Sequence, residues 1–89
     1  MSDTTYNGWV NRETWAAALW LGNEEGVYHG LIDSLRWNHG TNAGEVVRLY
    51  VEDLFDGMPD ATKLMREDIG SMWRVDWDAV AESFASDAA

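Results

Sequence analysis

Carboxylates are the most numerous side chains in this sequence that could do chemistry. Sixteen Asp and Glu residues stand against six Lys and Arg residues, which gives a formal net charge of −10. The excess lies mainly in the second half, because residues 52–89 carry ten acids and three bases whereas residues 1–51 carry six acids and three bases. A surface of this sign repels nucleic acid and anionic lipid and attracts basic surfaces. We therefore expect a basic protein partner, with no direct nucleic-acid contact and no membrane contact.

The spacing of the acids suggests what they could bind. Four residues of helix rise about 6 Å, which is comparable with phosphates that follow one another at roughly 3.4 Å per step along the axis of a nucleic-acid strand. Arginine pairs with a carboxylate as it pairs with a phosphate, so a rigid ribbon of acids could occupy a basic groove that evolved for nucleic acid. A solvated acidic face, kept for solubility or by a halophilic origin, is the alternative. The candidate partner-binding residues are Glu45, Glu52, Asp53, Asp56, Asp60, Glu67 and Asp68, and the ribbon could continue through Asp76, Asp78 and Glu82.

The side chains that enzymes use do not form a recognisable site. The absence of cysteine excludes disulfides, thiolate metal sites and a Cys nucleophile. His29 and His39 are the only histidines, and neither has the spacing of a zinc site. Acids such as Asp53 and Asp56 could act as general acid and base, but a solvated helix face is the simpler interpretation. We expect no catalytic residue, no cofactor and no metal, although a Ser–His–Asp triad stays open.

Six tryptophans are the second unusual feature of the sequence. Tryptophan is a frequent anchor at protein interfaces, and six are many for a small core to cover. Trp37, at an expected helix end, and Trp73, beside an expected loop, are candidates for exposure. Burial in the core, or a half-buried position at its edge, is the alternative.

The stretch that must position these side chains is residues 7–21. Asn7-Gly8 is a turn signal, and Asn11 is suited to cap a helix by accepting from the amide of residue 13 or 14. Residues 15–21 carry no charge. Because a helix that is apolar over most of its surface is normally buried by its neighbours, we expect this one to be central.

Four further segments follow with helical periodicity. Asn23 is expected to cap a second helix that ends near Trp37, with a loop over residues 38–42. Thr41 or Asn42 is expected to cap a third helix over roughly residues 43–56, although its β-branched residues leave a strand open. The expected buried faces are Val27, Tyr28, Leu31, Ile32 and Leu35 in the second helix, and Val46, Val47, Tyr50, Val51 and Leu54 in the third.

Proline and glycine divide the rest of the chain. Pro59 ends the third helix, Asp60 is expected to cap a fourth segment, and Gly70 is expected to break or bend it. Asp76 is expected to cap a last helix. The sequence therefore predicts an all-α fold in which a single domain, residues 1–89, packs four to five short helices around a Trp-rich core, with residues 1–6 and 86–89 frayed.

The first five residues show no basic segment followed by an apolar run, and no stretch approaches the roughly 18 apolar residues that span a bilayer, so we expect neither a signal peptide nor a membrane span. We expect a cytoplasmic protein of the host cell, and the sequence leaves the oligomeric state open.

The opening of the chain reads Asn7-Gly8-Trp9-Val10-Asn11-Arg12-Glu13-Thr14-Trp15, followed by Ala18-Leu19-Trp20-Leu21 and Asn23-Glu24-Glu25-Gly26-Val27-Tyr28. With these residues the chain resembles a family of small acidic proteins encoded by phages, plasmids and other mobile elements. The match is looser in Val75-Asp76-Trp77 and Ala79-Val80-Ala81-Glu82. It covers about the first 28 residues well and the last dozen loosely, and residues 38–72 match no family pattern. The resemblance implies counter-defence and brings no catalytic residues with it.

The sequence thus leads to one functional expectation with open alternatives. We expect an anti-CRISPR-type inhibitor, not an enzyme, that acts as a DNA mimic: it binds a basic nucleic-acid groove of a CRISPR surveillance complex in the host and blocks target DNA. An antirestriction mimic that acts on a restriction-modification enzyme, or a non-catalytic structural protein of a phage, is the alternative.

Overall fold

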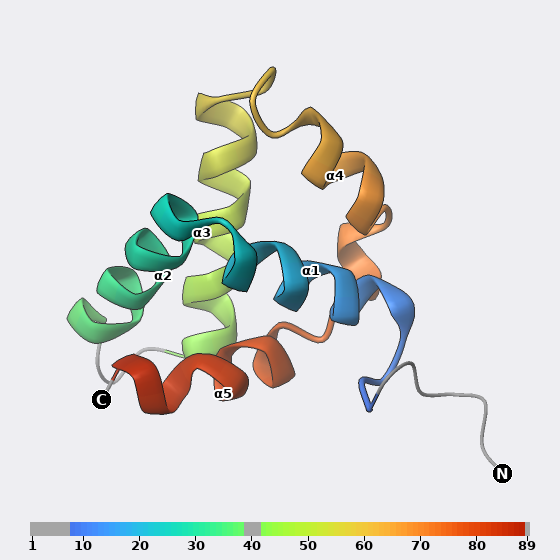
Figure 1. The fold of residues 1–89 in the computed structure, drawn as a ribbon. Helices are drawn as coiled ribbons and strands as arrows, with labels where there is room; N and C mark the ends of the chain where they lie inside the picture. Colours follow the sequence, from blue (N-terminus) through green and yellow to red (C-terminus); the bar gives the residue numbers. More distant parts are fainter. Residues whose placement is uncertain (1–7, 39–41, 89) are drawn as a thin grey trace, which may run out of the picture.

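The computed structural model describes residues 8–38 and 42–88, and over these residues it is all-α (Figure 1). The expected frayed end at residues 1–6, the turn position Asn7 and the loop histidine His39 lie outside the described residues. No helix in the described part of the chain is long and apolar enough to cross a membrane. The elements are α1 (Arg12–Asn23), α2 (Glu25–Trp37), α3 (Ala43–Gly57), α4 (Lys63–Ile69), the 3-10 helix η1 (Met72–Arg74) and α5 (Trp77–Ala88).

α1 lies at the centre of the fold, as its uncharged stretch over residues 15–21 predicts (Figure 1). It contacts α2, α4, α5 and η1. α3 packs along α5 and also contacts α2, and α2 contacts α5. The elements therefore surround one shared core in a body with extents of 39 × 31 × 21 Å.

Side-chain caps begin three of the helices, at the predicted Asn11 and Asp76 and at Asn42, one of the two candidates for α3. Asn11 accepts a 2.9 Å hydrogen bond from the amide of Thr14, and Asn42 accepts one of 3.1 Å from the amide of Glu45. Asp76 accepts one of 3.2 Å from the amide of residue 79. The first and last caps are also tied to each other, because the backbone N–H of Asp76 donates to the buried Thr14 hydroxyl at 2.9 Å. This bond holds the starts of α1 and α5 together.

The structure corrects two local expectations. Asn23 is the last residue of α1, and Glu24 stands before α2 without a side-chain cap. Asp60 does not cap α4: the chain makes turns over residues 59–62, so the helix begins only at Lys63. α5 continues to Ala88, which is buried, and Tyr28 donates a 2.8 Å hydrogen bond to the Asp87 carboxylate. The fraying expected at residues 86–89 stays a prediction.

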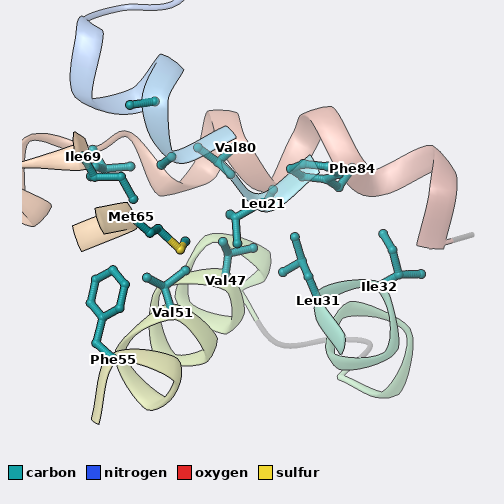
Figure 2. Close-up of a cluster of buried hydrophobic side chains, with 14 of the residues drawn as sticks. Leu21, Leu31, Ile32, Val47, Val51, Phe55, Met65, Ile69, Val80 and Phe84 are labelled. Atoms are coloured by element: carbon teal, nitrogen blue, oxygen red, sulfur yellow. The ribbon is translucent and has the colours of Figure 1, made fainter. Parts of the chain in front are cut away.

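The centre of the core is aliphatic rather than rich in tryptophan (Figure 2). Four tryptophans, at positions 9, 15, 20 and 77, are partly buried and pack against the rim of the core. An indole is large and carries an N–H that needs an acceptor, which makes complete burial uncommon. The fully buried side chains of largest volume are Leu21, Leu31, Ile69, Val47, Val51, Val80 and Thr14.

Candidate partner-binding surface

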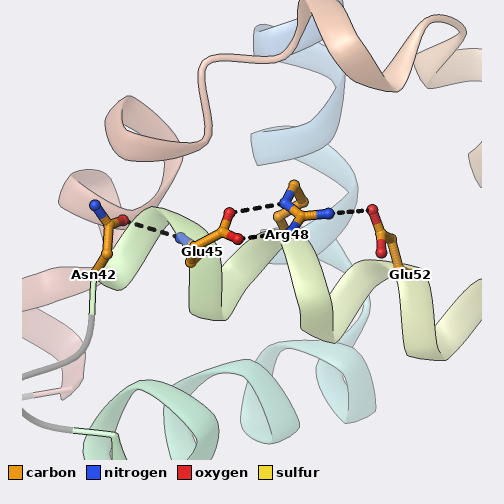
Figure 3. A network of polar contacts seen from close by, with 4 residues as sticks. All are labelled: Asn42, Glu45, Arg48 and Glu52. Atoms are coloured by element: carbon orange, nitrogen blue, oxygen red, sulfur yellow. Dashed lines mark hydrogen bonds and ion pairs between the residues drawn. The ribbon is translucent and has the colours of Figure 1, made fainter.

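Two of the seven candidate acids, Glu45 and Glu52, share one arginine on α3 (Figure 3). Arg48 donates to the two oxygens of Glu45 at 2.8 and 2.6 Å, and to Oε2 of Glu52 at 2.6 Å. These hydrogen bonds hold the pKa of the Glu45 carboxyl below its ordinary value. The three side chains stand one helical turn apart on the same face. The group retains a net charge of −1 instead of −2.

A third candidate, Asp68, has a role in the fold. One of its oxygens accepts from Arg12 at 2.9 Å, and the other accepts from the indole N–H of Trp20 at 2.7 Å. Both donors belong to α1, so this carboxylate fastens α4 to the central helix. Since both oxygens are engaged, Asp68 has less capacity for a partner than its position in the sequence suggested.

The other four candidates are exposed and have no Lys or Arg partner among the described residues. They are Asp53 and Asp56 in the second half of α3, Asp60 in the following turn and Glu67 in α4. Asp56 stands one helical turn after Glu52 on the same exposed face of α3. These carboxylates keep their full charge. The structure therefore leaves a shorter acidic face than seven free acids would give.

α5 supplies a second group of uncompensated acids. Asp76, Asp78 and Glu82 line an open hollow of about 580 Å³ between the start of α3 and α5. Asp76 caps the helix, while Asp78 and Glu82 have no ion-pair partner among the described residues. Like charges at this i, i+4 spacing repel, and α5 contains no basic residue to relieve the repulsion. Asp78 and Glu82, which could continue the acidic ribbon, are thus acids whose negative charge no nearby Lys or Arg of the described chain offsets.

The two tryptophans proposed as exposed are exposed. Trp37 at the end of α2 and Trp73 in η1 each keep 82% of their surface accessible. Trp73 borders a groove of about 450 Å³ that is lined by Arg48, Glu52, Met72, Trp73 and Trp77. The acidic face of α3 therefore adjoins an aromatic surface formed by Trp73 and Trp77. The sequence did not reveal this neighbourhood, because α3 and these tryptophans are separated by more than one helix in the chain.

The described part of the chain contains one of the two histidines, His29. His29 lies on the exposed side of α2 with its Nε2 3.9 Å from a Glu25 oxygen, and its ring meets the edge of Tyr28. No serine hydroxyl among the described residues has a hydrogen bond to His29. No group of three or more His, Cys, Asp or Glu residues in the described part of the chain could hold a metal ion.

Comparison with known proteins gives a family and no activity. One family model, described as a family of unknown function (DUF7249), matches residues 2–87. No curated protein and no solved structure matches the chain.

Proposed function

Because the chain belongs to the DUF7249 family, whose function is unknown, we propose a function from the chain's own surface: it is a non-catalytic inhibitor that places carboxylates in a basic nucleic-acid groove of a host defence complex. The resemblance of the opening residues makes a CRISPR surveillance complex the first partner to test. A restriction-modification enzyme is the second.

One observation carries the proposal: the arginines of the chain are already engaged by the chain itself. Arg12, Arg36, Arg48 and Arg74 each lie within 4.0 Å of a carboxylate, at distances of 2.6 to 3.8 Å. The guanidinium of Arg66 lies over the Phe55 ring, 5.6 Å from its centroid. Asp53, Asp56, Asp60 and Glu67 therefore remain exposed, with no Lys or Arg partner among the described residues.

The contact surface that we propose is the exposed side of α3 together with the turn and helix that follow it. Asp53, Asp56, Asp60 and Glu67 supply unpaired carboxylates there, and the Glu45–Arg48–Glu52 group adds a further net charge of −1. A helix holds its side chains at fixed intervals, so a partner's Lys and Arg residues meet charges without having to order them. Such an association is fast and sensitive to salt.

The proposal is tested by competition for DNA. A purified CRISPR surveillance complex is mixed with fluorescent target DNA, and this protein is added at low and at high salt. We expect it to displace the DNA at low salt and to do so less well as salt screens the charges. A purified restriction enzyme with its own site is the parallel arm, and it decides between the two partners.

Matched variants locate the contact. The double variant Asp53→Asn/Asp56→Asn removes two unpaired charges from α3 and should weaken displacement about tenfold at low salt, since an exposed pair contributes up to about 1 kcal/mol. The control Glu24→Gln/Glu25→Gln removes the same charge where α1 meets α2 and should retain most of the activity. Equal loss in both variants, or no displacement by the unaltered protein in either arm, contradicts the proposal.

A further inference from the structure

The groove beside α3 combines features that suit one kind of side chain. It lies between α3 and the segment that carries η1, has a volume of about 450 Å³ and is open to solvent along Trp73. Its walls include two indole rings, a thioether and a carboxylate, from Trp73, Trp77, Met72 and Glu52. Trp77 is partly buried against the core, which fixes that side of the groove.

The charges at the groove favour a cation. Arg48 also lines it, but its guanidinium is taken up by Glu45 and Glu52. The ion pair with Arg48 engages Oε2 of Glu52. The other oxygen of that carboxylate accepts no hydrogen bond from the described residues, and the Glu52 side chain is 46% exposed. Two carboxylates around one guanidinium leave a net charge of −1, so a phosphate or a nucleotide that stacks on the indoles is repelled.

The chain itself shows how a guanidinium meets this aromatic surface. The guanidinium carbon of Arg74 lies 5.7 Å from the centroid of the Trp73 ring. Arg74 is held there by Glu13, whose Oε2 is 3.3 Å from its Nε. The Trp73 side chain is 82% exposed although Arg74 lies beside its ring, so the ring retains accessible surface for a second cation. Cations are attracted to the face of an indole, and arginine is the more frequent cation in such pairs.

We propose that this groove takes an arginine side chain of the basic partner, with its guanidinium stacked on Trp73 and hydrogen-bonded to Glu52. The inference rests on the proposed function, because it names one contact of the interface that the acidic face makes. Lysine fits less well, since its compact ammonium is more strongly hydrated and cannot stack as a planar group. A second copy of the chain is a poor occupant, because two molecules of charge −10 repel and the arginines of each are engaged internally.

The test uses the full chain and a simple probe. A blocked peptide of arginine–glycine repeats is titrated into the protein, and the indole N–H signals are followed by NMR. We expect the signal of Trp73, assigned from the Trp73→Ala spectrum, to move most. Trp73→Ala should weaken binding roughly fivefold, in line with an exposed cation–π contact. The matched control is Trp37→Ala, which removes an equally exposed indole at the far end of α2.

The carboxylate is tested in the same way. Glu52→Gln should weaken binding of the arginine peptide more than Glu25→Gln does. The control Glu25→Gln removes one charge from a side chain that is 90% exposed and lies outside the groove. A lysine–glycine peptide of equal length should bind more weakly than the arginine peptide. Its affinities for Trp73→Ala and Trp37→Ala should also differ less from each other. Equal binding by Trp73→Ala and Trp37→Ala overturns the inference, as does a dimer in sedimentation that only Trp73→Ala dissociates.

Failure of this inference is separable from failure of the proposed function. If the protein displaces DNA and depends on Asp53 and Asp56 but binds arginine peptides without a Trp73 effect, only the groove assignment is lost. If the peptide binds at Trp73 but no defence complex releases its DNA, the groove remains an arginine site and the partner must be sought elsewhere.

Discussion

At the scale of single residues, Asp68 illustrates how an acid in an acidic protein can belong to the fold. Its two oxygens accept from Arg12 and from the indole of Trp20, and both donors come from the central helix. The Trp20 N–H is partly buried with the ring, so it depends on this acceptor. A donor that loses its partner on folding costs free energy.

Replacing Asp68 should therefore affect stability, unlike replacing a free acid. We expect Asp68→Ala to lower the free energy of unfolding by about 1 to 2 kcal/mol, measured by urea denaturation. Asp53→Ala, which removes the same charge from an exposed position of α3, should stay within about 0.5 kcal/mol of the unaltered protein. Equal effects of the two substitutions would falsify the structural role of Asp68.

The Glu45–Arg48 pair gives a second residue-scale prediction, on pH. The folded-state pKa of Glu45 is lowered by hydrogen bonds from Arg48. The pair therefore stabilises the fold above the unfolded pKa, near 4.5, and this contribution is lost as pH falls through the folded pKa. We expect Arg48→Gln to lower Tm at neutral pH and to differ less from the unaltered protein in acid. Lys63→Gln, at a cation with no carboxylate within 4.0 Å in the described chain, serves as the control and should show no such convergence.

At the scale of elements, the crossing of α3 and α5 depends on a residue without a side chain. A Cβ built on Gly44 would overlap Oδ1 of Asp78 and lie 2.9 Å from the Asp78 backbone nitrogen. The start of α3 therefore approaches the backbone of α5 as closely as glycine allows. The same approach brings Asp78 to the acidic hollow.

Gly44→Ala should separate the two helices. We expect it to lower the free energy of unfolding by about 1 to 3 kcal/mol, the usual cost of overpacking. Gly26→Ala is the matched control, because a Cβ there meets no atom within 4 Å in α2, and alanine in a helix should then be neutral or stabilising by up to about 1 kcal/mol. Thermal unfolding followed by circular dichroism measures both, and a loss at Gly26 equal to that at Gly44 would contradict the close approach.

At the scale of the whole molecule, charge acts on folding and on binding in opposite directions. A net charge of −10 on 89 residues makes the compact state repel itself. Salt screens this repulsion, with a Debye length of about 10 Å at 0.1 M, and it equally screens attraction to a basic partner. The same ions should stabilise the protein and weaken its proposed complex.

We therefore expect Tm to rise as NaCl is increased, while displacement of DNA from the partner declines over the same range. Scanning calorimetry and the competition assay measure the two trends on one sample series. The variant Glu24→Gln/Glu25→Gln, with less self-repulsion, should show a smaller rise in Tm. A fall in Tm with salt would mean that the internal ion pairs outweigh the repulsion between the unpaired acids.

The sequence alone determined the all-α class, the central place of α1 and the caps at Asn11 and Asp76, because helical periodicity and capping depend on residues within a few positions of one another. It left Thr41 and Asn42 as alternative caps of α3, and the structure shows Asn42 in that role. It also indicated that Trp37 and Trp73 are exposed. Only the tertiary structure decided which acids are free, since Asp68 meets Arg12 and Trp20 across 56 and 48 residues. The groove at Trp73 likewise exists only because residues of α3, η1 and α5 line it together. Ion pairs and grooves of this kind form between segments remote in the chain, and no local pattern records them.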